Sequence, residues 1–278
     1  APHLAIRLAT LNPAAYFGLP RTGAIAPGQR ADMVVFSRLE DPVVEAVYAD
    51  GQRVAEHGRL LETAVFPDPI PPAPAMHVDP AALDFRVTAA GARIRVIEIV
   101  PGQIVTRQGQ AATPVADGRA VADPDRDLLK IAVVERHRGT ARTGIGFVKG
   151  MELRRGALAS SVAHDAHNII VVGARDDDML AAVRHVVDMQ GGLAVVADGK
   201  VLASLALPIA GLMSPEPIRS IQDQLTGLTR AARDLGTSLP DPFMTLSFLA
   251  LPVIPELKIT DRGLVDVDRF EPVDLFVG

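Results

Sequence analysis

One stretch of the chain concentrates side chains that can transfer protons. Residues 160–168 read Ser-Ser-Val-Ala-His-Asp-Ala-His-Asn, so two imidazoles, a carboxylate, an amide and two hydroxyls fall within nine residues. An apolar run, 169–172, follows at once and predicts a buried strand. Loops at strand ends often carry reactive side chains, and histidine is best suited to proton transfer near neutral pH. We therefore take residues 160–168 as the candidate site.

Two other interpretations of this stretch stay open. Histidine and aspartate near turns often make local hydrogen bonds, so these groups could instead satisfy one another and cap the strand. His164 and His167 share one face if the stretch is helical, and Glu135 and His137 would add metal ligands if the fold brought them near. The strand predicted directly afterwards favours a loop, and neither His-Glu-x-x-His nor His-x-His occurs. A metal site is therefore the weaker interpretation.

Other motifs give little support to other reactions. Ser160 and Ser161 lie outside any Gly-x-Ser-x-Gly elbow, which argues against a serine hydrolase. The glycines at 144 and 146, and those at 191 and 192, lack the strand and helix context of a dinucleotide site, so we expect both pairs to lie in turns. Residues 207–214 are apolar and turn-rich, which suits a pocket wall or equally a core loop.

The elements that must position the candidate site form a mixed pattern. Apolar runs predict strands at 93–100, 104–107, 129–135, 169–172, 192–197 and 201–206. Helices are predicted at 176–189 and 216–235. Asp198-Gly199 predicts a hairpin between the last two strands. Because strands and helices do not alternate strictly, we expect an α+β fold and not a doubly wound parallel sheet.

The first 78 residues divide differently. Leu4, Leu8 and Leu11 have helical spacing and predict an amphipathic helix that ends or kinks at Pro13. Short strands follow between 23 and 61, with a hairpin at Asp50-Gly51, and they are too few to be stable alone. Five prolines within 66–74 predict an extended linker. We expect a terminal helix at 1–20, strands at 21–66, the linker at 67–78 and a larger domain at 79–278.

Composition excludes several classes of protein. The 278 residues are 48% hydrophobic and 22% charged, which is typical of a globular chain of about two domains. The net charge of −5 provides no basic surface for nucleic acid, and no apolar stretch approaches the length of a membrane span. The absence of cysteine excludes disulfides and thiolate sites and suits a cytoplasmic location. Because the chain opens Ala-Pro-His inside a helical pattern, we expect it to be the C-terminal part of something longer.

Several stretches resemble known families. Residues 23–35, Gly-Ala-Ile-Ala-Pro-Gly-Gln-Arg-Ala-Asp-Met-Val-Val, resemble the segment with which amidohydrolase-superfamily enzymes leave their metal-binding barrel and complete a small β-sandwich. Residues 160–173, 207–214 and 241–261 look like the C-terminal domain of bacterial adenine deaminases. The resemblance covers essentially the whole chain, from the last barrel helix to its end. Met151-Glu152 departs from the family pattern, which has an apolar or aromatic residue and a glycine there.

The resemblance implies a function as well as a fold. The chain would be the C-terminal portion of a hydrolase that converts adenine and water into hypoxanthine and ammonia, acting in purine catabolism as a homo-oligomer. The binuclear manganese or iron site of such enzymes is held by barrel residues, which this chain lacks. The upstream barrel half is therefore the implied partner, and the isolated chain is expected to be inactive.

The resemblance also implies roles within the loop, which would close over the barrel mouth. His164 and His167 would hydrogen-bond the purine or relay a proton to the leaving amine, and Asp165 would orient an imidazole. Ser161 and Asn168 would bind the substrate. None of these residues is expected to ligate a metal. The alternative function is a non-catalytic module for oligomerisation or small-ligand binding, with the apolar tract 243–257 as its interface.

Overall fold

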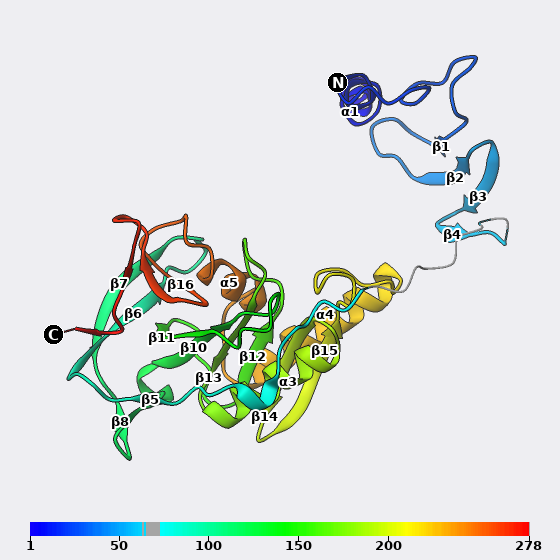
Figure 1. The fold of residues 1–278 in the computed structure, drawn as a ribbon. Coiled ribbons are helices and arrows are strands. Elements are labelled where there is room, and N and C mark those ends of the chain that lie inside the picture. Colours follow the sequence, from blue (N-terminus) through cyan, green and yellow to red (C-terminus); the bar gives the residue numbers. More distant parts are fainter. Residues whose placement is uncertain (63, 65–72, 278) are drawn as a thin grey trace. The chain divides into compact units, whose positions relative to one another are not determined.

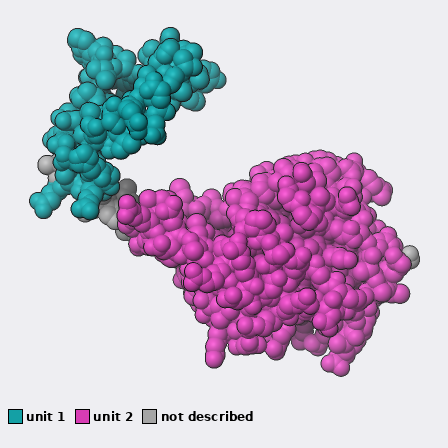
Figure 2. All heavy atoms as spheres, turned by 180° about the vertical axis from the view of Figure 1, so that it is seen from behind, with its two compact units in different colours: residues 1–70 teal, residues 71–278 magenta. Residues whose placement is uncertain are grey.

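The computed structural model describes residues 1–62, 64 and 73–277. The chain forms two compact units, Ala1–Ile70 and Pro71–Gly278, called unit 1 and unit 2 here (Figure 2). Residues 67–72 of the expected linker lie outside the described residues, and the division into four segments stays a prediction. Among the described helices, none is long and apolar enough to cross a membrane.

The described residues of unit 1 form two short helices and one antiparallel sheet of order β1-β2-β3-β4 (Figure 1). Its elements are α1 (Pro2–Ala9), α2 (Leu11–Tyr16), β1 (Met33–Phe36), β2 (Val44–Ala49), β3 (Gln52–Glu56) and β4 (Arg59–Leu60). The hairpin predicted at Asp50-Gly51 is confirmed, since it joins β2 to β3. Within residues 1–62, the buried hydrophobic side chains are Ala14 and Ala46. The described part of unit 1 therefore has almost no core of its own.

The N-terminal helical segment breaks earlier than the sequence suggests. We expected an end or a kink at Pro13, but α1 ends before Thr10, whose φ of −130° and ψ of −86° separate it from α2. Pro13 instead lies in the first turn of α2, where the backbone N–H has no helical partner and proline is tolerated. Leu4 and Leu8 are 51% and 67% exposed, so the predicted apolar face has no partner within the described residues.

Unit 2 is built on a nine-stranded sheet of order β15-β14-β12-β13-β10-β11-β6-β19, with β7 also paired to β6 (Figure 1). Its strands are β6 (Arg93–Ile99), β7 (Thr106–Ala112), β10 (Leu129–Val134), β11 (Thr143–Lys149), β12 (Ala157–Ser160), β13 (Ile169–Gly173), β14 (Gly192–Ala197), β15 (Lys200–Ala206) and β19 (Phe276–Val277). Only the pairing of β11 with β6 is parallel among these described strands. Strand β7 pairs with β6 along its whole length. The other edge of β6 is therefore shared by β11 and β19.

Two small sheets accompany the large one. The first has the order β5-β9-β8 and consists of β5 (Val87–Thr88), β8 (Val115–Ala116) and β9 (Arg119–Ala120). The second has the order β16-β17-β18 and consists of β16 (Leu257–Thr260), β17 (Gly263–Asp266) and β18 (Glu271–Val273). Short 3₁₀ turns span Pro80–Ala82 and Pro124–Arg126.

Helices cover both faces of the large sheet, and the alternation of side chains along β10 shows how. Ala132 and Val134 pack in one apolar cluster with α3 (Asp176–Asp188). Ile131 and Val133 point the other way, into a cluster with α4 (Ile218–Asp234), α5 (Pro242–Leu249) and the β16–β17 hairpin. Successive side chains of a strand face opposite sides, so a strand buried on both faces becomes apolar throughout. The α+β fold class is therefore confirmed.

Two expectations about unit 2 are wrong. Gly144 and Gly146 were expected in a turn but lie inside β11. The β16–β17 hairpin packs directly on them, and a Cβ at Gly144 would lie 2.0 Å from the Thr260 carbonyl oxygen. The tract 243–257, expected as an interface, is partly internal, because Phe243 and Leu246 are buried under the sheet while Met244 and Val253 are 50% and 56% exposed. The proposed oligomer interface on this tract is therefore not available as a continuous surface.

Candidate functional site

The candidate loop connects two buried neighbouring strands. It runs from the end of β12 to the start of β13, which pair antiparallel with Ser160 opposite Ile170. The His167 amide donates to the Ala163 carbonyl at 2.6 Å, which closes the loop on itself. The His164 amide donates to the carbonyl of Ser247 in α5 at 3.2 Å. The loop is therefore fixed to the sheet at its ends and to a helix at its middle.

The two imidazoles of the loop lie against each other. The ring centroids of His164 and His167 are 5.6 Å apart at an interplanar angle of 71°, and His164 also packs on Phe248 at 4.8 Å. Burial, with the neighbouring charges of His164 and Arg136, lowers the pKa of His167, so its ring is neutral at pH 7. Its Nδ1 atom is buried and has no hydrogen-bond partner within the described residues. A neutral imidazole with an unpaired nitrogen can accept or donate a proton.

Asp165 and Asn168 lie on one side of the loop. Both line a cavity of about 200 Å³, together with Thr260, Asp261 and apolar side chains that include Pro252. Asp165 is exposed, and in the described part of the chain it makes no hydrogen bond to either imidazole. Asn168 is buried, and its side-chain oxygen accepts from the Arg136 amide at 3.3 Å. The structure thus brings Asp165 and Asn168 to one cavity and packs His164 against His167, but it does not bring all four side chains to one surface.

Ser161, the fifth expected site residue, faces the interior. Its hydroxyl donates to the Gly211 carbonyl at 2.6 Å and accepts from the Gly192 amide at 2.8 Å. The side chain is fully buried. In this structure Ser161 therefore fastens the loop to the 207–214 tract, and a contact with substrate stays a prediction.

Glu135 and His137, the further metal ligands considered from the sequence, are occupied by the backbone. Burial acts to raise the pKa of Glu135, but hydrogen bonds from the Thr140 hydroxyl and three backbone amides hold it at about 2. His137 Nε2 lies 2.7 Å from the Ala166 carbonyl oxygen. Across residues 1–62, 64 and 73–277, no group of three His, Asp or Glu side chains is arranged to hold a metal ion.

Sequence reasoning missed Arg136. Its guanidinium is buried and lies beside an open depression of about 570 Å³, which is also lined by His77, His137 and His167. A charged residue directly after an apolar strand was the only sequence signal. That signal does not reveal which loops the strand end would meet.

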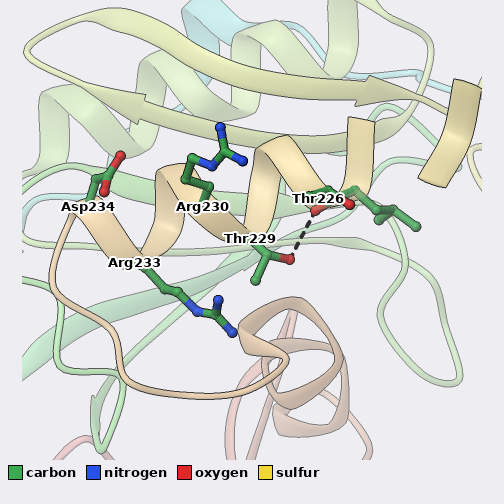
Figure 3. A pocket seen from close by; sticks show the side chains of 6 residues that line it. Thr226, Thr229, Arg230, Arg233 and Asp234 are labelled. Atoms are coloured by element: carbon green, nitrogen blue, oxygen red, sulfur yellow. Dashed lines mark hydrogen bonds between the residues drawn. The ribbon is translucent and has the colours of Figure 1, made fainter. Parts of the chain in front are cut away.

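A third hollow, of about 460 Å³, lies along α4 (Figure 3). All six of its lining residues come from this one helix: Leu225, Thr226, Thr229, Arg230, Arg233 and Asp234. The Thr229 hydroxyl donates to the carbonyl of Leu225 in the same helix at 2.9 Å. A hollow on one exposed helix does not converge groups from different elements, so we do not consider it a site.

Two parts of the chain match known protein families. Residues 1–54 match the amidohydrolase family, and residues 103–271 match the adenine deaminase C-terminal domain. The chain belongs to the adenine deaminase C-terminal domain family, since that match spans more than half of it.

Curated relatives agree with this assignment. The chain is 54% identical over 275 residues to an adenine deaminase of Desulfatibacillum aliphaticivorans, covering 99% of this chain and 48% of that protein. It is 48% identical to an adenine deaminase of Methanothrix thermoacetophila, with the same two shares covered. It is 50% identical to one of Methylobacterium nodulans, covering 96% of this chain and 47% of that protein. The chain therefore spans about half the length of the curated relatives it matches.

Proposed function

We propose that this chain is the C-terminal part of an adenine deaminase and that residues 161–168 form a loop that closes over the substrate. The observation that carries the proposal is the pair of packed imidazoles, His164 and His167, in a chain of this family. A neutral His167 with an unpaired, buried nitrogen is suited to moving a proton.

The proposed reaction replaces the exocyclic amino group of adenine with oxygen from water. A bond forms between the water oxygen and C6, and the bond from C6 to the amino nitrogen breaks. Of the two protons of the water, one passes to the purine ring, and the other passes to the departing nitrogen, which leaves as ammonia. His164 or His167 would deliver that proton or hydrogen-bond the purine. The Asp165 carboxylate would accept a hydrogen bond, and the Asn168 amide would contact the ring.

We place the metal chemistry of this enzyme outside the described residues. A binuclear manganese or iron site does not fit them, because Glu135 and His137 are occupied by backbone groups and no other group of ligands converges. The partner that would hold the metals is the upstream barrel half. Assembly as a homo-oligomer and a cytoplasmic location belong to the same proposal.

The test uses His164→Ala and His167→Ala in a full-length adenine deaminase that contains this chain. Each variant is expected to lower kcat/KM by about 10²–10⁴, as for a lost acid–base group, with metal content intact and Tm little changed. His185→Ala is the matched control, because His185 is also half-buried but lies on α3 outside the loop. It should leave kcat/KM unchanged.

The outcomes separate three roles for these histidines. Near-normal kcat/KM in either variant would remove that residue from the proposed site. Loss of metal in step with loss of activity would make it a ligand. A fall in Tm with activity retained per folded molecule would return it to a structural role, because orphaning a buried polar group costs about 1–3 kcal/mol.

A further inference from the structure

Arg136 lies beside the candidate loop because of strand register. The last pair of β10 with β13 joins Val134 to Ile169. Continuing this antiparallel register by two residues puts Arg136 opposite His167. The Arg136 side chain is nearly inaccessible, with 3% of the residue exposed. A charged group at such a position needs partners that replace its lost hydration.

Those partners are carbonyl groups from three separate segments. Nη1 donates to the Ala75 oxygen at 2.7 Å, Nη2 donates to the Ala210 oxygen at 2.9 Å, and Nε donates to the His167 oxygen. Within the described residues, no carboxylate lies within ion-pair distance of Arg136. Burial lowers the pKa of the Arg136 guanidinium, which nevertheless remains charged because its ordinary value is so high. The planar, five-donor fork suits this convergence of carbonyls, and a lysine ammonium does not.

The 207–214 tract is fastened at two successive carbonyls. Arg136 holds the carbonyl of Ala210, and Ser161 holds that of Gly211. Gly211 has a φ of +74°, and a Cβ there would lie 2.9 Å from Arg136 Nη1. On the other side, the His77 amide donates to the Arg136 carbonyl at 2.8 Å. The three segments therefore share Arg136 as their common contact.

The backbone of His167 is held on both sides by this arrangement. Its φ of +49° is left-handed, a conformation that histidine rarely adopts without support. Its amide is fixed by Ala163 and its carbonyl by Arg136. With both peptide groups held, the Cα–Cβ bond has one direction, and the packing of the ring against His164 at 5.6 Å then limits its rotation about that bond.

We propose that Arg136 is a positioning residue of this site, which fixes the direction of the His167 imidazole by binding the carbonyls of Ala75, His167 and Ala210 together. Arg136 acts through His167 and does not itself contact the substrate. The consequence for turnover rests on the proposed function, whereas the consequence for the ring of His167 does not.

The first experiment measures turnover by full-length enzyme carrying Arg136→Lys, which keeps the charge and loses the fork. We expect kcat to fall by about 10²-fold with KM nearly unchanged, since a small misplacement of a reacting group has such an effect. Arg155→Lys is the control, because Arg155 is an exposed arginine paired with Asp198, and it should leave kcat unchanged. A normal kcat in Arg136→Lys would overturn the proposal.

A double-mutant cycle then asks whether Arg136 acts through His167. In the His167→Ala background, Arg136→Lys should lower kcat/KM by less than about twofold, because its target is gone. An equal loss in both backgrounds would overturn the proposal, since Arg136 would then act elsewhere.

The second experiment does not depend on activity. Histidine ring resonances are followed by NMR in the 278-residue chain with Arg136→Met or Arg136→Lys. The charged and titratable groups around His167 are His164, Arg136, Asp165 and His137, and Arg136 lowers the pKa of His167. Arg136→Met should raise that pKa and shift the ring resonances, whereas Arg136→Lys should shift the resonances and leave the pKa near its parent value.

The resonances of His185, outside the loop, should stay in place in both variants. Unchanged His167 resonances in Arg136→Lys would overturn the positioning role even if Arg136→Met does not fold. If His167→Ala retains normal activity, His167 is removed from the proposed site, and the NMR result alone decides whether Arg136 positions its ring.

Discussion

Replacing Glu135 with glutamine should destabilise the chain strongly at neutral pH. One carboxylate oxygen of Glu135 accepts from the amides of His137 and Arg138 at 2.6 and 2.9 Å. The other accepts from the amide and hydroxyl of Thr140 at 3.2 and 2.8 Å. Glutamine keeps the shape but has one oxygen, so its NH₂ group faces the Thr140 amide, donor against donor. We expect Glu135→Gln to lower the free energy of unfolding by about 2–4 kcal/mol at pH 7.

The pH dependence of this effect follows from the pKa of Glu135. Folding lowers that pKa from 4.5 to about 2, so the stabilisation is fully present above pH 4.5 and is lost as the pH falls toward 2. The difference between the two pKa values corresponds to about 3 kcal/mol at pH 7, of which about 2 kcal/mol is lost by pH 3. Glutamine does not titrate, so the difference in the free energy of unfolding between parent and Glu135→Gln should fall by about 2 kcal/mol from pH 7 to pH 3.

Urea unfolding followed by far-ultraviolet circular dichroism at pH 7, 5 and 3 measures this gap. Glu216→Gln is the control, because Glu216 is exposed, and it should change stability by less than about 0.5 kcal/mol. A gap for Glu135→Gln below about 1 kcal/mol at pH 7, or a gap of equal size at pH 7 and pH 3, would refute the reasoning.

Further predictions concern stability and protection. In hydrogen exchange, amides of β1–β4 should be less protected than those of β13, because unit 1 has almost no core as described; equal protection would contradict this. Gly211→Ala should lower the free energy of unfolding by about 2–4 kcal/mol, because its φ is strained for alanine and the new Cβ clashes with its neighbours. Gly118→Ala, also at positive φ but with open space around it, should lower that free energy by only about 1 kcal/mol. Thermal unfolding measures both changes. Equal losses would rule out the clash. Asp176→Asn should lower the free energy of unfolding by about 2–3 kcal/mol, because it removes the carboxylate 2.6 Å from the buried Lys130 ammonium. Asp177→Asn, at an exposed position, should leave the free energy of unfolding nearly unchanged. No change in Asp176→Asn would show that Lys130 finds another partner.

The part of the fold that could be predicted is the part with local patterns. The strands corresponding to β10, β13, β14 and β15 and the helices corresponding to α3 and α4 are confirmed, because each has an apolar run or a helical period within itself. β11 and β12 were missed. Gly144 and Gly146 interrupt the apolar pattern of β11 to admit the β16–β17 hairpin, a requirement of tertiary packing that local sequence does not reveal.

The candidate site divides in the same way. The loop at 161–168 could be located from residue types alone, and the structure brings His164 and His167 together. The task of Ser161 and the importance of Arg136 could not be predicted, because both depend on carbonyls at 75, 210 and 211 that are distant in the chain. Every residue has a backbone carbonyl, so the sequence around these partners gives no motif that identifies them.

The division into two units has a consequence for optical spectroscopy. The chain contains no tryptophan and two tyrosines, Tyr16 and Tyr48, and both belong to unit 1. Tyrosine fluorescence and near-ultraviolet absorbance therefore come almost entirely from unit 1, while unit 2 contributes only the weak bands of phenylalanine. After a proteolytic cut between the units, a detector set to these bands would register the smaller product and overlook the larger one, which contains the candidate site.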